Sequence, residues 1–313
     1  MVKIRKKNKV LYYICGFSAP YLPKSNAEKR ISQLLKTMSA EDMKDVEFRL
    51  NYYNKLNAEK KFNSEFRIKD LKHPISPKSY YFDTYEYARF FDESLKLNFV
   101  FGDVNIILPL PAITKSRPIS GENQNNVILN LDKVRHFFEL HDTNNFDTKT
   151  GKMIGRNAVK QSHREQFFEQ YFDHPLCDLG QINTTGGGKP EWIKPKISIA
   201  EHLDYKYILS LEGNDVATNL KWIMASNSIA VAPKMKMESW YMEGLLQPGV
   251  HYIQINDDYG NLEAQLQYYQ DHPKEATEII QSAKAYRKQF DNPQKEDLIS
   301  LLVLQKYLKM ANH

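Results

Sequence analysis

Short apolar segments alternate with amphipathic ones through the second half of the chain, and this alternation constrains the fold more than any other feature. Strand-like runs lie at 176–179, at 199–203 leading into 207–211, at 228–231 and at 251–255. Helix-like stretches lie at 164–172, 216–225, 238–246, 262–269 and 273–290. Strands that alternate with helices form a parallel sheet with helices on both faces. The pattern therefore predicts an α/β fold.

The first half of the chain has the same mixed character with less regularity. We expect a helical stretch over 26–60 and strand-like runs at 98–101, 104–108 and 127–129. The segment DTNNFDTKTG (142–151) consists of turn-forming residues and marks the preferred domain boundary. A length of 313 residues suits two domains. We predict an N-terminal α/β domain over 1–150, a C-terminal α/β domain over 151–290, and a helix over 291–313 that packs back across the domains.

The N-terminus combines a basic segment with an apolar run over 10–17. The basic residues are Lys3, Arg5, Lys6, Lys7 and Lys9. This order imitates a signal peptide, but the run is short, β-branched and aromatic. We therefore predict a first buried strand followed by a loop. The apolar stretch 99–113 is interrupted by glycine, proline and polar residues, so no other segment is expected to span a membrane.

Charge and cysteine content narrow the classes of function. The net charge of +5 suits anionic ligands such as nucleotides or phosphorylated sugars. Beyond residue 9 the basic residues are mixed with acidic ones, which argues against a nucleic-acid-binding protein. Cys15 and Cys177 have no metal-type spacing and are interpreted as two buried, reduced thiols in a reducing compartment. The histidines are scattered, so no metal site is expected.

The segment YILSLEGNDVATNLKW (207–222) carries the densest chemical signal. It is expected to form a strand, a turn and the start of a helix, and the N–H groups at a helix start bind anions. Gly213 permits close approach of the backbone to a ligand. Thr218, Asn219 and Lys221 add donors for a pyrophosphate. An ordinary strand–turn–helix connection capped by Asn or Asp would give the same pattern.

A second candidate segment, IGRNAVKQSHR (154–164), is basic. Its positive and imidazole side chains are Arg156, Lys160, His163 and Arg164. Arginine binds phosphate oxygens in a bidentate manner, so two arginines in this setting suit a diphosphate. A solvated basic helix start is the alternative interpretation.

Two further segments place carboxylates beside possible ligands. Glu238, on the expected helix 238–246, could accept both hydroxyls of a ribose, or it could be a surface carboxylate over packed aromatic residues. In FGDVNIILPLPAITKSRP (101–118), Asp103 could act as a general base for a sugar hydroxyl. Lys115 and Arg117 could bind an anionic acceptor. A strand-end acid followed by a solvated basic loop is the alternative.

Taken together and in this order, the four segments resemble glycosyltransferase family 90, in particular its bacterial lipopolysaccharide-core branch. More distantly the chain is similar to the protein O-glucosyltransferases and capsule xylosyltransferases. The resemblance runs from about 102 to 310 and is strongest over HPLCDLGQ (174–181), YKYILSLEGNDVATNLKWIMASNS (205–228) and PGVHYIQINDDY (248–259). It implies a GT-B fold, in which two Rossmann-like domains face each other across a cleft. It also implies an inverting hexosyltransferase that uses a UDP-sugar and no catalytic metal or cofactor.

The resemblance assigns several residues to the donor side. Arg156, Ala158 and Arg164 match the family's Arg-Gly-Ser…Arg segment, with Asn157 in place of the glycine. Asp178 lies in the matching segment 174–181. The remaining matches belong to the loop that cradles the diphosphate and comprise Asn214, Asp215, Val216, Ala217, Thr218 and Asn219. Eukaryotic members have an arginine where this chain has Asn219, so Lys221 or Arg164 would supply the charge.

The catalytic base is where the chain departs from the family. Eukaryotic members use an Asp immediately before Tyr-Pro, and the corresponding region 107–111 reads Ile-Leu-Pro-Leu-Pro, without an acid. Asp103 is our candidate base, with Asp142 and His141 in reserve.

The reaction implied by the resemblance is transfer of a hexose from UDP to a lipopolysaccharide core. The enzyme would be cytoplasmic, with possible peripheral contact at the cytoplasmic face of the inner membrane and no nucleic-acid partner. The alternatives are a capsule or protein O-glycosyltransferase, and a non-catalytic nucleotide- or glycan-binding homologue.

Overall fold

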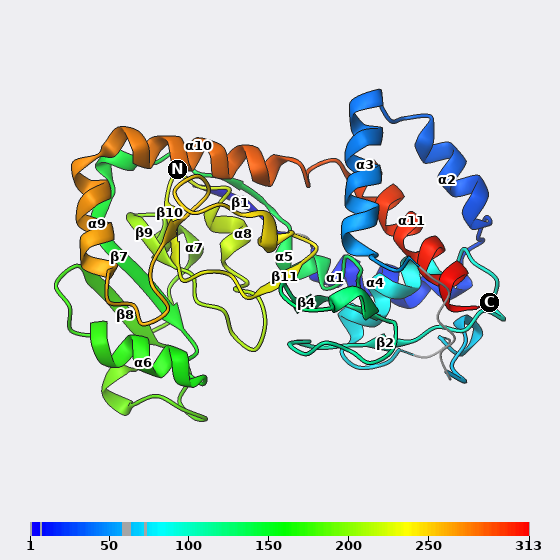
Figure 1. Cartoon of the computed structure of the whole chain (residues 1–313), viewed down its shortest axis with the longest axis horizontal. Coiled ribbons are helices and arrows are strands. Elements are labelled where there is room, and N and C mark those ends of the chain that lie inside the picture. Colours follow the sequence, from blue (N-terminus) through cyan, green and yellow to red (C-terminus); the bar gives the residue numbers. More distant parts are fainter. Residues whose placement is uncertain (1, 7, 58–63, 72–73, 313) are drawn as a thin grey trace. The chain divides into compact units, whose positions relative to one another are not determined.

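The computed structural model describes residues 2–6, 8–57, 64–71 and 74–312, which form two compact units. Unit 1 comprises Met1–Arg5, Phe137–Met235 and Leu245–Gln289, and unit 2 comprises Lys6–His136, Lys236–Gly244 and Phe290–His313. Each unit contains helices and a parallel sheet, which confirms the predicted α/β class (Figure 1).

Unit 1 is built on a five-stranded parallel sheet. Its strand order is β12-β10-β9-β7-β8. The strands are β7 (Thr150–Asn157), β8 (Cys177–Gln181), β9 (Tyr205–Leu209), β10 (Ile229–Ala232) and β12 (Ile253–Gln254). Most of their residues are buried on both faces, as expected for a parallel sheet covered by helices. The predicted strands of the second half are therefore confirmed, with the exception of 199–203.

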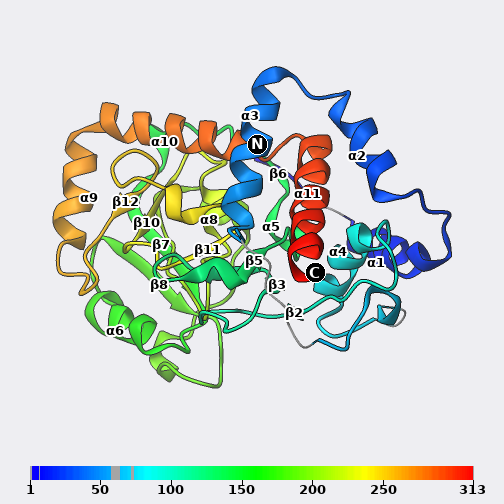
Figure 2. The same ribbon diagram turned by 45° about the vertical axis from the view of Figure 1, so that its right-hand side comes forward.

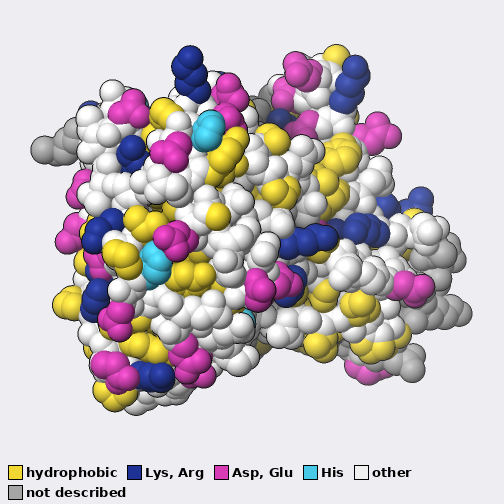
Figure 3. All heavy atoms as spheres, turned by 60° about the vertical axis from the view of Figure 1, so that its left-hand side comes forward, with side chains coloured by type: hydrophobic (Ala, Val, Ile, Leu, Met, Phe, Trp, Pro, Cys, Tyr) yellow, Lys and Arg dark blue, Asp and Glu magenta, His cyan; other side chains and the backbone are white. Residues whose placement is uncertain are grey.

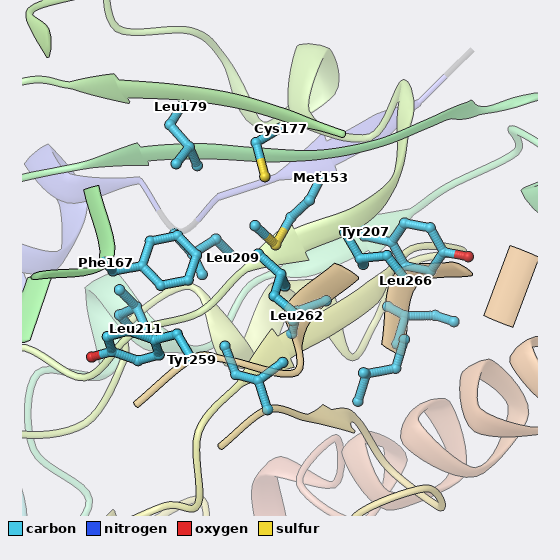
Figure 4. Packing of buried hydrophobic residues seen from close by; sticks show 14 of the residues in the cluster. Met153, Phe167, Cys177, Leu179, Tyr207, Leu209, Leu211, Tyr259, Leu262 and Leu266 are labelled. Carbon is cyan, nitrogen blue, oxygen red and sulfur yellow. The ribbon is translucent and has the colours of Figure 1, made fainter. Parts of the chain in front are cut away.

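The core of unit 1 lies between this sheet and three helices. These helices are α6 (Ser162–Tyr171), α9 (Leu262–Asp271) and α10 (Pro273–Lys288). Figure 4 shows Met153 and Leu209 of the strands gathered with Phe167 of α6 and Leu262 of α9. Two one-turn helices, α7 (Ile199–His202) and α8 (Leu220–Ile223), contact β9 and β10.

Two predictions for unit 1 were wrong. Residues 199–203 form α7 instead of a strand, because Ser198 and Glu201 make a capping box at its start. The expected helix 216–225 is reduced to α8. The side-chain amide of Asn219 donates to the carbonyl of Leu209 at 2.9 Å, and this bond holds the preceding residues in a loop that returns to the strand end.

Unit 2 combines α-helices with small sheets. Its helices are α1 (Lys9–Ser18), α2 (Ala27–Leu35), α3 (Ala40–Tyr53), α4 (Lys78–Ala88), α5 (Lys133–His136) and α11 (Pro293–Ala311). The parallel strands β2 (Phe99–Val100), β3 (Ala112–Thr114) and β5 (Asn126–Ile128) lie in the order β2-β3-β5. Helix α11 packs against α2, α3 and α4 (Figure 2). No helix in the described part of the chain is long and apolar enough to cross a membrane.

The strand expected at 10–17 is the helix α1, and this prediction was wrong. A short apolar run fits a buried strand or a helix equally well from periodicity alone. The Asn8 side chain caps the helix by accepting the N–H of Leu11, and Gly16 lets α1 approach the ring of Phe82. A Cβ added at Gly16 would lie 2.6 Å from that ring. Contacts in the tertiary structure therefore selected the helix.

Three other predictions for unit 2 need correction. The expected helix 26–60 is two helices, because a capping box of Ser39 and Asp42 starts α3 anew, and 58–60 lie outside the described residues. Residues 104–108 do not form a strand, since the side chain of Asn126 bonds the backbone of this segment instead. The expected helix 238–246 contains the strand β11 (Met237–Ser239), which pairs with β4 (Ser116–Pro118).

The compact units and the predicted domains divide the chain differently at residues 1–5 and 137–150, which contain paired strands, and at residues 236–244. Residues 137–150 belong to unit 1, where β6 (Glu139–His141) pairs with β1 (Lys3–Arg5). Residues 236–244 belong to unit 2 through the pairing of β11 with β4. In both places the segment belongs to its unit because its strand pairs with residues far away in the sequence. Such a pairing cannot be predicted from local composition.

Candidate functional site

The strand order of unit 1 indicates where a ligand binds. The first strand, β7, is flanked by the second strand, β8, on one side and by the third, β9, on the other. The connections from β7 and β9 therefore leave the sheet in opposite directions. In such sheets ligands bind in the crevice outside the carboxyl ends of the strands at this switch point. The segments that follow Asn157 and Leu209 thus form the candidate site.

Arg164, near the start of α6, joins these two segments. Its Nη1 donates to the carbonyl of Ala158 at 2.9 Å, in the loop after β7. Its Nη2 and Nε donate to the carbonyls of Leu211 and Glu212 at 2.7 and 2.9 Å, in the loop after β9. His163 also contacts the Glu212 carbonyl through Nε2 at 2.9 Å. Two neighbouring side chains of α6 therefore hold the two loops together.

The charge of Arg164 has no acidic partner among the described residues. Burial is the main influence and lowers the pKa of its guanidinium to about 10, with the Tyr259 hydroxyl acting in the opposite sense. The group is still protonated at neutral pH. A guanidinium carries five N–H donors, and three of its nitrogens are engaged by the three carbonyls. Gly213 lies beside Nη2, where an added Cβ would come within 3.4 Å. The site therefore contains a half-buried cation with donors to spare next to a residue without a side chain.

The loop after β8 packs against the same place. Gly186, Gly187 and Gly188 all have positive φ, and a Cβ on Gly187 would lie 2.8 Å from the carbonyl of Val159. The Asn183 side chain accepts the N–H of Val159 at 2.6 Å and also donates to its carbonyl. Sequence reasoning did not select this loop, residues 184–190, as part of the site. The three glycines in a row were the signal that a close backbone contact was needed.

The loop over 212–219 holds most of the predicted diphosphate residues. Gln161 donates to Asn214 Oδ1 at 3.0 Å, which ties this loop to the start of α6. Asn219 donates to the carbonyl of Leu209 and accepts from the hydroxyl of Ser210. The other predicted residues divide by exposure: Asp215, Val216, Ala217 and Lys221 are buried, whereas Thr218 is exposed. The expected helix start is absent from 214–218, since α8 begins only at Leu220.

Arg156 and Asp178 form a separate group on the sheet. Arg156 Nη2 lies 3.0 Å from Asp178 Oδ1, and its Nη1 donates to the Asp178 carbonyl at 2.8 Å. Lys194 and Tyr205 also donate to the Asp178 carboxylate. Burial by itself raises the pKa of Asp178, but the bonds from Lys194 and Tyr205 and the charge of Arg156 outweigh it, so the net pKa is lowered. The two arginines that the sequence treated alike therefore differ. Arg156 has an acidic partner, which it shares with Lys194, and Arg164 has none among the described residues.

In unit 2, charged residues follow each strand of the parallel sheet. Asp103 follows β2, Lys115 follows β3, and Asp132 lies four residues beyond β5. Lys115 Nζ donates to Asp103 Oδ1 at 2.8 Å, and the Asp103 side chain is 43% exposed. Sequence reasoning did not select Asp132. This carboxylate is buried, its backbone has a φ of 60°, and burial raises its pKa although Arg135 and Lys115 lower it. A non-glycine residue in the left-handed region is a marker of functional strain.

Arg117 and Glu238 are also in unit 2 and bind each other. Their side chains form a buried ion pair, with Nε 2.7 Å from Oε1. Tyr52 donates to the other Glu238 oxygen, and Arg117 also donates to the Tyr52 carbonyl at 2.7 Å. The predicted roles of these two residues, in acceptor and ribose binding, stay predictions. In the described structure the pair connects β4, β11 and α3.

The two reserve candidates for the base lie in unit 1. His141 belongs to β6, opposite Lys3 of β1. Asp142 is buried and accepts from Lys149 Nζ at 2.9 Å and from the N–H of Asn227 at 2.8 Å. Within the described ranges no three or more His, Cys, Asp or Glu side chains come together in a way that could hold a metal ion.

These features define an α/β protein whose doubly wound sheet presents a cationic site at its switch point. The profile of glycosyl transferase family 90 matches residues 160–312. The O-glucosyltransferase LpsA of Dichelobacter nodosus is 40% identical over 310 residues, which cover 98% of this chain and 97% of that protein. Protein O-glucosyltransferase 2 of Danio rerio is 30% identical over 93 residues, 29% of this chain and 18% of that protein. The chain belongs to glycosyltransferase family 90 and is a glycosyltransferase, as the sequence segments predicted.

Proposed function

We propose that the enzyme transfers a hexose from a UDP-sugar to the lipopolysaccharide core or a related surface glycan, with inversion at the anomeric carbon. Glucose is the hexose we propose, because LpsA of Dichelobacter nodosus is named an O-glucosyltransferase. The observation that carries the proposal is Arg164, a cation at the switch point of the sheet for which the described part of the chain provides no acidic partner.

The donor diphosphate lies against the loops after β7 and β9 in this proposal. The free N–H donors of Arg164 and the backbone beside Gly213 contact its oxygens. Lys160, which is exposed in the β7–α6 loop, adds a second positive charge. Donors that are already in place before the reaction stabilise the charge that develops on the leaving group. This set of cations takes the place that a metal ion has in other transferases, so the proposed reaction needs neither a metal nor a cofactor.

The two units form a GT-B enzyme in this proposal, with the acceptor on unit 2 and the donor on unit 1. Each unit has a parallel sheet with charged residues beyond its carboxyl ends, which supports that assignment. A carboxylate of unit 2 removes the proton of the acceptor hydroxyl. The hydroxyl oxygen forms a bond to the anomeric carbon while the bond to the β-phosphate oxygen breaks, and UDP leaves with the electron pair. Asp103 is the first candidate for this base and Asp132 the second.

The proposed location is the cytoplasm, at the cytoplasmic face of the inner membrane, where a lipid-linked core acceptor would be met. Two alternatives use the same donor site. A capsule or protein O-glycosyltransferase would differ only in its acceptor, and a non-catalytic homologue would bind UDP without turnover.

The test is a nucleotide-release assay with UDP-, GDP-, ADP- and CMP-sugars, with and without chelator, and with truncated lipopolysaccharide core as acceptor. We expect release from UDP-glucose that depends on the core acceptor and survives chelation. Strict dependence on manganese would refute the metal-free mechanism. Release of UDP with a capsule fragment or a peptide in place of the core would reassign the acceptor. If UDP binds in a thermal-shift assay but no combination of donor and acceptor gives nucleotide release, the non-catalytic homologue is favoured.

A further inference from the structure

Helix α1 and the 3₁₀ turn η1 (Ala19–Tyr21) that follows it present apolar side chains to solvent. The exposed side chains are Val10, Leu11, Ile14, Phe17, Tyr21 and Leu22, and we call them the α1 face. Their exposed fractions run from 47% for Phe17 to 88% for Tyr21. The spacing of Val10, Ile14, Phe17 and Tyr21 by four, three and four residues places them along one side of a helix. Contiguous apolar patches of this kind on a folded protein mark interaction sites.

The opposite side of α1 fixes the helix to unit 2. Tyr12 donates to Asp83 Oδ1 at 2.9 Å and to the carbonyl of Ser79 at 3.0 Å, both on α4. Tyr13 makes an edge contact with the ring of Phe82, with centroids 5.7 Å apart. Gly16 has no side chain, so the helix can lie directly against the same ring. The α1 face is therefore held outward by the packing of the other side. Figure 2 shows α1 beside α4.

The sequence segment that carries the α1 face has charged residues of only one sign. The sequence contains no Asp or Glu before Glu28, and its charged residues up to that point are Lys3, Arg5, Lys6, Lys7, Lys9 and Lys24. Lys9 is exposed at the first position of α1, and Lys78 of α4 lies 5.6 Å from the ring centroid of Phe17. Lys24 forms an ion pair with Glu93 at 2.6 Å, so it adds less positive charge to this surface than the other lysines do. Beyond Glu28 the sequence mixes both signs. The face drawn in Figure 3 likewise carries Lys and Arg side chains interspersed with Asp and Glu.

We propose that the α1 face binds an anionic lipid bilayer, with its apolar side chains inserted at the level of the headgroups. A surface helix with exposed aromatic and aliphatic side chains and with lysines beside them presents the groups by which interfacial helices bind membranes. Basic residues near the bilayer are attracted by anionic headgroups, which a neutral protein partner or a second copy of this basic segment would not provide. The inference deepens the location proposed above by assigning the surface responsible for it. It does not depend on which acceptor is used.

The test measures binding of the full-length protein to vesicles, without donor or acceptor. The vesicles contain phosphatidylcholine and phosphatidylglycerol in equal amounts, or phosphatidylcholine alone, and bound protein is separated by flotation. The variant Leu11→Gln/Ile14→Gln removes apolar side chains from the α1 face. The matched control is Ile106→Gln/Leu110→Gln, whose side chains are 60% and 46% exposed in another part of unit 2. Circular dichroism and thermal unfolding check that both variants are folded.

We expect the wild type and the control to float with the anionic vesicles, and high salt to weaken the binding. The α1 variant should bind at least about tenfold less, because two large apolar side chains no longer leave water. Equal binding of the α1 variant and the control would overturn the proposal. So would failure of the wild type to bind anionic vesicles, or a concentration-dependent dimer that only the α1 variant loses. UDP release with a soluble acceptor fragment is measured in parallel, so that loss of membrane binding and loss of transfer are separate results.

Discussion

Replacing Arg164 by Gln removes a positive charge and most of the N–H donors of this side chain. The side chain donates to the carbonyls of Ala158, Leu211 and Glu212, and it has no acidic partner among the described residues. Loss of one positive donor aimed at the developing charge of a leaving group costs about a hundredfold in rate, or about 2.7 kcal/mol. We therefore expect kcat/KM with UDP-glucose to fall by about that factor and the affinity for UDP to fall with it.

The same substitution also weakens the fold, and the two effects have to be separated. Three carbonyls lose charged donors, which lowers the free energy of unfolding by about 1–3 kcal/mol. His163→Ala is the matched control, because it removes a contact to the same Glu212 carbonyl and leaves the guanidinium in place. The assay combines thermal unfolding, calorimetric titration with UDP and steady-state UDP release, all well below the unfolding temperature. We expect the control to lose stability with little loss of UDP affinity. An Arg164→Gln protein that is folded and has unchanged UDP affinity and kcat/KM would refute the assignment of the diphosphate to this site.

Three other perturbations test different parts of the structure. Asp103→Asn should abolish transfer and leave UDP binding intact. Transfer is measured in single-turnover experiments and UDP binding by titration. If Asp103→Asn stays active while Asp132→Asn is inactive, the base is Asp132. Asp142→Asn leaves the buried ammonium of Lys149 without its carboxylate and should lower the free energy of unfolding by about 3–5 kcal/mol in urea titrations. Burial raises the pKa of Asp83 to about 6 in the folded chain. Between about pH 4 and pH 6 the folded chain therefore holds a proton here that the unfolded chain has lost. The free energy of unfolding should fall by about 3 kcal/mol as the pH rises through this range. Urea unfolding across this range should show that component in the wild type and not in Asp83→Asn, and equal pH profiles would contradict it.

The parallel sheet of unit 1 was readable from the sequence because its strands are buried on both faces. Such strands are continuous apolar runs, and residues 207–211 and 228–231 were recognised on that basis. The long helices α6, α9, α10 and α11 were recognised for a similar reason, since an amphipathic pattern over ten or more residues has few alternatives. Other helices were missed or predicted too long. The four-residue helices α7 and α8 are decided by a cap or by one side-chain contact. α1 is as long as α6, but its apolar run also fits a strand, and its cap and the contact of Gly16 with Phe82 decide it.

The candidate site was predicted in its residue types and only partly in its arrangement. The sequence placed Arg156 and Arg164 together as two diphosphate ligands because both belong to the basic segment 154–164. The structure pairs Arg156 with Asp178 on the neighbouring strand, and among the described residues Arg164 has no acidic partner. Arg117 and Glu238 were assigned to different ligands, and they are bonded to each other through the pairing of β4 with β11. No spacing in the sequence records that partners 121 residues apart will meet.

The sequence by itself determined the α/β class and the family, and it selected the two loops of unit 1 that form the candidate site. These depend on local periodicity and on sequence segments that match the family in order. Only the tertiary structure decided which charges are neutralised, that Asp132 follows β5 in a strained backbone, and that the apolar run near the N-terminus is a helix with one side exposed. The physical reason is the same in each case. The free energy of a charge or an apolar side chain depends on what surrounds it, and those surroundings come from residues far away along the chain.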